Sequence, residues 1–518
     1  MVDMLIKLGT LALFAAVMIG VGLYCRRRAT NVSNFVLGGR SIGPWLTAFS
    51  YGTSYFSAVV FVGYAGQFGW RYGVATTWIA IANALIGSHL AWTILGRRTR
   101  IMTQSMDSST MPQFFGVRFD SRALKLFASA LIFIFLIPYT ASLYNGLSRL
   151  FEMAFHVDYA VCVTLMAVLT AIYVIAGGYM ASSINDFIQG IIMLGGIIAV
   201  VWAVLLRCGG FLQALDSLAH VSDAAVSSTP GVFASFFGPD PLNLLGVMLL
   251  TSLGTWGLPQ MVQKFYAIKS EKDIQKGTVI STIFAVIVAG GCYFLGGFGR
   301  LFADKVDVAK DGFDAIIPAM LSGLPVFLIA IVVVLVFSAS MSTLSSLVLA
   351  SSSTLTLDFL KGSVCPKMSE RGQLRTMRSL IAVFIVISAV IAVFQHRSHV
   401  SFIAQLMGIS WGALAGAFLA PFLYGLYWKS VTKSACAVNF AFAACVMIAN
   451  MLWRAHFPTL LQSPINAGAF CMLAGMVLVP IVSLLTPKCD RKRVDELFAC
   501  YDRKVTVAVT QSIETDEK

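Results

Sequence analysis

Charged residues are scarce in this chain, and that scarcity is the first constraint on what it can be. Asp, Glu, Lys and Arg together make up 12% of the 518 residues, whereas apolar residues make up 58%. The mean hydropathy is +0.81. Soluble globular domains carry roughly 25% charged residues, so the composition excludes that class and indicates an integral membrane protein.

The sequence also lacks the motifs on which ATP-driven pumps and metalloproteins depend. It contains no GxxxxGK[ST] nucleotide-binding motif, and its ten cysteines and six histidines show neither CxxC nor other metal-ligand spacing. No nucleophile stands beside a base or a metal cluster within the apolar segments, so we expect no enzymatic activity. We therefore expect an ion gradient, and not ATP, to supply the energy for any active process.

Long apolar runs recur from the first residues almost to the last. A helix that crosses a hydrocarbon core needs about 20 apolar residues, and about thirteen runs of this length are present. They cover residues 4–25, 42–66, 74–96, 123–152, 158–177, 184–207, 243–263, 277–300, 322–355, 379–395, 400–427, 434–453 and 467–486. Lipid offers the backbone no hydrogen bonds, and the alternation of barrel strands is missing. The sequence therefore predicts an all-α integral membrane protein.

Basic residues gather in alternate loops and explain the net charge of +13 without a nucleic-acid partner. These loop residues include Arg26, Arg27, Arg28, Arg97, Arg98, Arg100, Lys264, Lys269, Lys272 and Lys276. Lys and Arg concentrate on the cytoplasmic side of a membrane. With an odd number of spans, the pattern predicts an outside N-terminus and a cytoplasmic C-terminus in the plasma (inner) membrane.

Two apolar segments carry polar and helix-breaking residues at their middle. The second contains Ser-Tyr-Gly-Thr-Ser-Tyr-Phe-Ser at 50–57, and the seventh contains Thr-Ser-Leu-Gly-Thr-Trp-Gly-Leu-Pro-Gln at 251–260. Unwinding near 52–56 would free carbonyl groups for an ion, and paired interrupted helices are typical of transporter binding sites. Small residues also permit close helix packing, and this simpler interpretation stays open for each segment.

Hydroxyl groups line one face of the ninth segment. The residues Ala339, Ser342, Thr343 and Ser346 are spaced to share that face. Neutral hydroxyls and carbonyls suit a sodium ion that must also be released. Asp186 is a lone carboxylate near the start of the sixth segment, where it is either a functional group or a carboxylate favoured by the helix dipole.

Several sequence patterns together resemble the sodium:solute symporter family. They are Asn-Phe-Val-Leu-Gly-Gly-Arg at 34–40, Ser57, the stretch from Gly-Gly at 177–178 to Asp-x-x-Gln at 186–189, and Met-Ser-Thr at 341–343. The resemblance spans nearly the whole chain and implies a LeuT-like fold with a 5+5 inverted-repeat core. It implies an extra helix and loop over 1–40, the ten-helix core over 41–428, two extra helices over 429–487 and a cytoplasmic tail over 488–518.

The resemblance also implies where sodium binds. The main site resembles the carbonyl groups of Thr53, Phe56 and Ala339 with the hydroxyls of Ser342 and Thr343. A second site, present in some members, resembles Asp186, Ser342, Ser345 and Ser346. One or two sodium ions are therefore the expected coupling ions.

The solute is less visible in the sequence. The residues expected to face a midplane cavity are Ser54, Ser57, Asn83, Tyr139, Thr251, Thr255, Trp256, Gln405, Ser410 and Trp411. Since this set holds no cation, a small neutral, zwitterionic or monocarboxylate nutrient, such as an amino acid or organic acid, fits better than a multiply charged solute. A sugar or a sialic acid is the alternative.

Four positions argue against proline itself. The proline-transporting branch of the family has an acidic residue and aromatic side chains where this chain has Tyr55, Val59, Thr251 and Thr255.

We expect sodium-coupled import by alternating access, with the chain functional as a monomer in the lipid bilayer. A channel is less favoured because it needs an open polar path, and a sensor because the tail after Lys488 is short.

Overall fold

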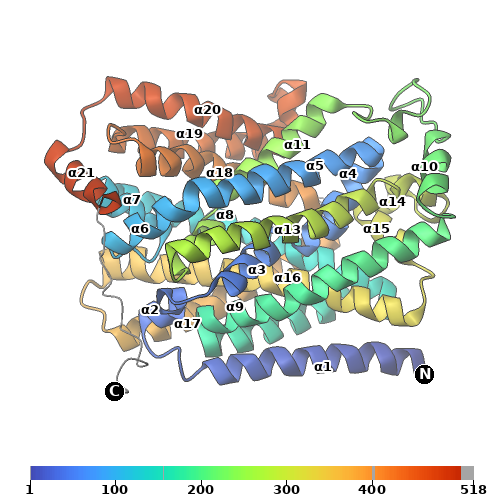
Figure 1. Ribbon diagram of the computed structural model, residues 1–518, viewed down its shortest axis with the longest axis horizontal. Coiled ribbons are helices and arrows are strands. Elements are labelled where there is room, and N and C mark those ends of the chain that lie inside the picture. The colour runs from blue at the N-terminus through green and yellow to red at the C-terminus, as the bar shows by residue number, and fades with distance from the viewer. Residues whose placement is uncertain (1, 156, 399–402, 503–518) are drawn as a thin grey trace, which may run out of the picture.

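The computed structural model describes residues 2–155, 157–398 and 403–502. Within these ranges every regular element is a helix, and strand-like pairing is limited to two isolated bridges. Most long helices run along the horizontal direction of Figure 1, with α1 at the lower edge and α19 and α20 near the upper edge. This arrangement confirms the all-α membrane architecture.

The long helices follow the predicted apolar runs. They are α1 (Val2–Cys25), α3 (Pro44–Tyr55), α8 (Arg122–Phe155), α9 (Tyr159–Arg207), α11 (Pro241–Leu253), α13 (Glu271–Gly296), α16 (Val326–Thr354), α17 (Glu370–Ser398), α18 (Ile403–Tyr427), α19 (Lys433–Leu452) and α20 (Pro464–Leu485). Short helical pieces of the stretches Val59–Ser105 and Pro241–Ala267 are α4 (Ala65–Tyr72), α5 (Thr77–Ala82), α6 (Arg97–Ser105) and α12 (Pro259–Ala267). Shorter helices are α2 (Val32–Leu37), α7 (Met111–Arg118), α10 (Phe211–Ala219), α14 (Val308–Asp311), α15 (Ile316–Leu321) and α21 (Arg491–Phe498). Large apolar side chains such as Leu13, Trp202 and Phe327 are exposed on the outer helices, as lipid-facing residues are.

Eleven helical stretches among the described residues are long and apolar enough to cross a membrane, fewer than the number predicted. The stretch Val59–Ser105 contains Gly73 with φ of +61°, and Tyr159–Arg207 contains Gly178 with φ of +57°. Glycine takes such angles at little steric cost, so the chain bends at each point while the helix continues on both sides. Each of these stretches joins two predicted segments. The count of thirteen therefore stays a prediction.

The second predicted segment is interrupted, as expected, but at the end of the predicted stretch. α3 continues through Tyr55, and Phe56 leaves the helical region with φ of −99° and ψ of 82°. The helix resumes after Ser57. Gly52 stays helical and serves packing, because a side chain there would lie 2.4 Å from the Phe284 ring.

The seventh predicted segment is interrupted between α11 and α12. Leu258 is extended, with φ of −79° and ψ of 124°, and Pro259 occupies the first turn of α12. Proline forces the residue before it out of the helical region, and its missing N–H is not needed in a first turn. Pro259 therefore both ends one half of the segment and starts the other.

The assignment of Lys264 to a cytoplasmic loop is wrong. α12 runs to Ala267 and all of its residues are buried, so Lys264 lies inside the helix bundle with 2% of its surface exposed. The predicted segment ended at residue 263 because Lys264 begins a series of basic residues, whereas the helix that Pro259 starts continues to Ala267. A buried lysine in a membrane segment indicates a functional group.

The interrupted helices meet α16 near the centre of the bundle. α3 packs against α9, α13 and α16, and α12 contacts both α3 and α16. Figure 1 shows α3 and α16 in the middle of the molecule, between α13 and α9. The two breaks and the hydroxyl face of α16 are thereby brought together.

Candidate sodium and solute site

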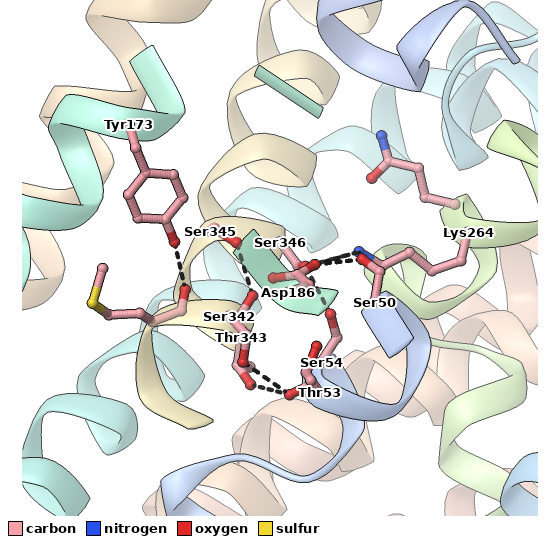
Figure 2. A network of polar contacts seen from close by, with 12 residues as sticks. Ser50, Thr53, Ser54, Tyr173, Asp186, Lys264, Ser342, Thr343, Ser345 and Ser346 are labelled. Carbon is pink, nitrogen blue, oxygen red and sulfur yellow. Dashed lines mark hydrogen bonds and ion pairs between the residues drawn. The ribbon is translucent and has the colours of Figure 1, made fainter. Parts of the chain in front are cut away.

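The break after α3 lies against the hydroxyl face of α16. Ser342 Oγ is 3.2 Å from the carbonyl oxygen of Thr53 and 3.3 Å from that of Ala339. Thr343 Oγ1 is 3.1 Å from each of the same two carbonyl oxygens. Figure 2 shows both hydroxyl side chains directed toward Thr53. Four oxygen atoms from two helices thus meet in the protein interior.

The spacing of these oxygens suits a sodium ion. Na⁺ has nearly the radius of Ca²⁺, whose oxygen ligands lie about 2.4 Å away, so ligands at right angles lie about 3.4 Å apart. The separations of 3.1 to 3.3 Å are close to this value, although the two hydroxyls here donate to the carbonyls. A bound ion would take the carbonyl lone pairs and turn the hydroxyl protons away. The set is therefore chemically competent for sodium.

The break also frees the carbonyl group of Phe56. The amide of Val60, which would close a helical turn onto Phe56, donates to the Ser57 carbonyl at 3.0 Å. The amide of Val59 donates to Ser57 Oγ at 3.2 Å. The Phe56 carbonyl thus lies outside the helical hydrogen-bond ladder, as a carbonyl that coordinates an ion must.

Two residues predicted for the second sodium site, Asp186 and Ser346, surround a buried ammonium group (Figure 2). Lys264 Nζ donates to Ser50 Oγ at 2.7 Å and to Ser346 Oγ at 3.0 Å. It lies 3.8 Å from Asp186 Oδ2, which accepts a short hydrogen bond from Ser50. Asp186 is fully buried and Ser346 is 4% exposed. Each charge neutralises the other in an environment that would not tolerate it alone.

The other two residues predicted for the second site face elsewhere. Ser345 Oγ donates to the carbonyl of Ser342 at 2.8 Å, within α16 itself. The Ser342 hydroxyl belongs to the cluster at the α3 break. Of the four residues predicted for the second sodium site, only Asp186 and Ser346 therefore lie together, beside the Lys264 ammonium group.

Asn83 ties the predicted solute residues to α11. Its Oδ1 accepts hydrogen bonds from Thr251 Oγ1 at 2.9 Å and from Ser252 Oγ at 3.0 Å. Tyr55 Oη donates to the carbonyl of Thr251 at 2.6 Å. Asn83 Nδ2 is buried and has no hydrogen-bond partner among the described residues. A donor of this kind is available to a solute.

Thr255 and Trp256 have partners of their own. Thr255 Oγ1 donates to the carbonyl of Gly87 at 3.0 Å, and Trp256 Nε1 donates to that of Ile86, also at 3.0 Å. Tyr51 Oη donates to the same Gly87 carbonyl at 2.6 Å. These bonds hold the break between α11 and α12 in place, so both residues have a structural role.

Tyr139 and Trp411 form an aromatic corner beside the α3 break. Their ring centroids lie 5.9 Å apart at 88°, and Trp411 stacks on Tyr55 at 6.1 Å. Tyr139 Oη and Trp411 Nε1 are buried without a hydrogen-bond partner in the described part of the chain. Buried Tyr and Trp donors usually find a partner, so these two are suited to a solute carboxylate or carbonyl.

Three further predicted solute residues are engaged within the protein. Ser54 Oγ lies 2.8 Å from Ser346 Oγ, and Ser410 Oγ donates to the carbonyl of Phe135 at 2.5 Å. Ser57 Oγ accepts a hydrogen bond from the backbone amide of Val59, as described above. They shape the region around the break but offer a solute fewer free donors than Asn83, Tyr139 and Trp411 do.

Gln405 lies apart from the other predicted solute residues. Arg454 Nη1 donates to its Oε1 at 3.3 Å, and both residues line a cavity of about 760 Å³. The same cavity reaches Val247, about one helical turn before Thr251. Gln405 therefore marks an approach to the solute residues and not their centre.

Sequence reasoning missed three residues of the polar network, namely Lys264, Ser50 and Tyr173. Tyr173 Oη donates to the carbonyl of Met341 at 3.0 Å and so fixes α9 against the hydroxyl face of α16. Lys264 carried a signal, because it follows a helix-starting proline by five residues and precedes Phe265. Ser50 belongs to the polar run 50–57 but carries no sign of its partner, and Tyr173 is ordinary in sequence, so only folding assigns the two residues their contacts.

Two interrupted helices, a cluster of hard oxygen ligands at one break and partner-free donors nearby define a cation-coupled secondary transporter. A model of the sodium:solute symporter family matches residues 35–439, and the chain belongs to this family. It is thus a multi-pass membrane protein and a sodium-coupled symporter of a small solute.

Similar proteins agree with this assignment. The chain is 30% identical over 459 residues to the osmoregulated proline transporter OpuE of Bacillus subtilis (strain 168), covering 86% of this chain and 88% of the relative. It is 29% identical over 494 residues to the sodium/proline symporter of Staphylococcus aureus (strain JH9), covering 93% and 92%. Both matches cover more than four fifths of each chain.

Solved structures share the fold. A substrate-bound, outward-open Na⁺-coupled sialic acid symporter superposes with a TM-score of 0.77 at 17% identity, over 94% of this chain and 98% of that one. The nucleobase-cation-symport-1 transporter Mhp1 superposes with a TM-score of 0.51 at 15% identity, over 91% and 99%. The LeuT-like fold expected from the sequence is thereby confirmed.

Proposed function

We propose that the chain imports a small zwitterionic or monocarboxylate nutrient, an amino acid first of all, together with sodium. The observation that carries this proposal is the cluster in which Ser342 and Thr343 of α16 meet the Thr53 carbonyl at the α3 break. An ion bound there joins two helices, so its binding favours one conformation. The same coupling raises the affinity for solute in that conformation.

The proposed roles follow the geometry. Sodium binds at the carbonyls of Thr53, Phe56 and Ala339 and the hydroxyls of Ser342 and Thr343. Solute binds beside the break, where Asn83, Tyr139 and Trp411 offer donors. None of these solute residues is charged, which supports a solute of low net charge. A carboxylate group on the solute would be partly neutralised by the adjacent sodium.

The proline-transporting relatives support an amino acid as the solute class. Identities of 29 to 30% leave individual solute positions free to differ. Thr251 and Thr255, two of the positions expected to differ from the proline-transporting branch, are tied to Asn83 and Gly87 by hydrogen bonds. We therefore propose an amino acid or a related monocarboxylate, with proline as the reference solute in the test.

The remaining features of the proposal concern the membrane. The chain would lie in the plasma (inner) membrane as a functional monomer, with its N-terminus outside and α21 in the cytoplasm. Residues 41–428 would form the transport core, and 1–40, 429–487 and 488–518 would be additions to it. The sodium gradient and membrane potential would drive import without ATP or enzymatic turnover, and nucleic acid would play no part.

Transport by the purified chain in lipid vesicles tests the proposal. Vesicles with an imposed sodium gradient, or a potassium gradient as control, receive labelled proline, other amino acids, monocarboxylates, a sugar and a sialic acid. We expect uptake of at least one amino acid or monocarboxylate with sodium only. Equal uptake in potassium would contradict sodium coupling, whereas uptake of the sugar or sialic acid alone would select the alternative solute class.

A further inference from the structure

The ammonium group of Lys264 lies where the family resemblance implies a second sodium ion. We propose that Lys264 supplies a tethered cation that fills this second position, so that the chain binds and couples a single sodium ion, at the main site. This inference rests on the sodium coupling proposed above and specifies how many ions take part.

The surroundings of Lys264 Nζ are those of a cation site. Two hydroxyl oxygens accept hydrogen bonds from it, those of Ser50 at 2.7 Å and Ser346 at 3.0 Å. The Asp186 carboxylate lies 3.8 Å away, and the centre of the Tyr179 ring lies 5.3 Å away. An ammonium group has three donors and no acceptor, so hydroxyls, a carboxylate and an aromatic face are the partners it needs.

The groups around the ammonium come from several helices, as the ligands of a bound ion at this position would. Ser50 belongs to α3, Asp186 to α9, and Ser346 to α16, while Lys264 itself comes from α12 (Figure 2). Ser346 is one helical turn beyond Ser342 of the main site. The tethered cation therefore links α12, the second half of the second interrupted helix, to α3 and α16, the two helices that form the main site.

Charge balance leaves no place for a second ion beside the lysine. Asp186 and Lys264 already form a neutral pair. A sodium ion next to them would be repelled by the Lys264 ammonium group, which already takes the hydroxyl oxygens of Ser50 and Ser346. Ser345 and Ser342 direct their hydroxyls to other acceptors. The charge of the ammonium group and the engaged hydroxyls of these four serines therefore disfavour an ion there.

A covalently attached cation differs from a sodium ion because it cannot be released across the membrane. Sodium at the main site can leave after the protein opens inward, whereas the ammonium of Lys264 stays with the chain. The second position thus organises the four helices but moves no ion across the membrane. The electrical driving force should then correspond to a single sodium ion per cycle.

The number of sodium ions bound per chain tests this inference without any solute. We would measure equilibrium binding of ²²Na⁺ to the full chain in lipid nanodiscs at saturation. The wild type should bind one ion. Lys264→Met leaves Asp186 unpaired and opens the position, so we expect two ions, a doubling of the bound sodium.

Matched variants separate the charge from other effects. The double variant Lys264→Met with Asp186→Asn is neutral again and should return to one ion. Lys269→Met removes an exposed lysine of the following loop and should leave one ion. Lys264→Gln removes the charge but keeps a hydrogen-bonding group, and it replaces Lys264→Met if that variant does not fold.

The outcomes are distinguishable. Two ions bound to the wild type, or one ion bound to the uncharged Lys264 variants, would overturn the tethered cation. No sodium bound to the wild type would overturn the proposed sodium coupling at the main site, and this inference with it. One ion in the wild type and two in Lys264→Met or Lys264→Gln would support both.

Discussion

At the scale of single residues, the site consists of two neighbouring arrangements of opposite kind. The main cluster is built from neutral oxygens, since Ser342 and Thr343 hydroxyls meet the carbonyls of Thr53 and Ala339. The neighbouring arrangement is built from the full charges of Asp186 and Lys264. Neutral ligands can release a cation, whereas a buried ion pair resists losing either partner. The first is therefore suited to a transported ion and the second to a fixed one.

Loss of one hydroxyl of the main cluster should weaken sodium binding directly. A polar group that contacts a buried charge contributes about 1.5–3 kcal/mol, so Ser342→Ala should lower the apparent sodium affinity roughly tenfold or more. Thr343→Ala should act in the same direction, and Thr343→Ser should retain most of the affinity because it keeps the hydroxyl. The measurement is the sodium concentration for half-maximal ²²Na⁺ binding.

The same helix offers a control for this prediction. Ser353 Oγ donates to the carbonyl of Leu349 within α16, away from the α3 break. Ser353→Ala should therefore leave the sodium affinity unchanged within about twofold. An equal loss in Ser353→Ala and Ser342→Ala would show that hydroxyl removal disturbs α16 as a whole.

At the scale of elements, a few backbone positions decide where helices stop, bend and restart. Pro259 starts α12, Phe56 ends α3, and Gly73 and Gly178 bend two long helical stretches. The break at Phe56 frees its carbonyl group, and both breaks place polar side chains inside the helix bundle, where only a protein-lined site can satisfy them. The element boundaries are therefore part of the binding site.

Gly178→Ala should destabilise the fold. Gly178 has φ of +57° and ψ of −145°, and an added Cβ would lie 2.7 Å from the Phe35 carbonyl oxygen. A non-glycine residue in such a conformation costs about 1–3 kcal/mol before any clash is counted. We expect a clear drop in the melting temperature measured by fluorescence-detected size-exclusion after heating.

Gly195 of the same helix provides the comparison. It has helical angles, and an added Cβ would meet nothing within 4 Å. Gly195→Ala should therefore keep or slightly raise the melting temperature, since alanine favours helix by about 0.5–1 kcal/mol over glycine. Equal melting temperatures for the two variants would contradict the role assigned to the bend.

At the scale of the whole molecule, alternating access requires contacts that hold one end closed and can be broken. Arg40, the last residue of the Asn-Phe-Val-Leu-Gly-Gly-Arg motif, makes such contacts ahead of α3. Its guanidinium donates to the carbonyls of Ser108 at 2.6 Å, Tyr266 at 3.1 Å and Thr103 at 3.2 Å. The start of the first broken helix is thereby fastened to the end of the second.

Arg40→Ala should loosen this end of the molecule. Three carbonyl groups lose a charged donor, each worth roughly 1.5–3 kcal/mol, so the population should shift toward conformations open at this end. Hydrogen–deuterium exchange followed by mass spectrometry should show faster exchange in segments 97–108 and 259–270.

An arginine with weaker contacts serves as the control. Arg122 is exposed and donates to the carbonyl of Ser363 at 3.4 Å. Arg122→Ala should leave exchange in 97–108 and 259–270 at the wild-type rate. Unchanged exchange in Arg40→Ala would show that Arg40 does not hold this end closed.

Much of the site could be predicted because its residues carry local signals. The hydroxyls of Ser342 and Thr343 repeat at helical spacing, and the glycine, proline and hydroxyl runs at 50–57 and 251–260 interrupt apolar segments. Such patterns depend on neighbours in sequence alone. Gln405 could not be separated from the solute residues in this way, because its distance from Thr251 depends on how α18 packs against α11.

The sequence by itself determined that this chain lies in a membrane, is helical throughout its apolar runs and breaks at two polar positions, because hydropathy and backbone propensity are local properties. Only the tertiary structure decided that Lys264 is buried and paired with Asp186. These residues lie on α12 and α9, far apart in the chain, and meet through packing with Ser50 and Ser346. A buried charge is tolerated only where a distant partner is brought to it, and no local pattern encodes that partner.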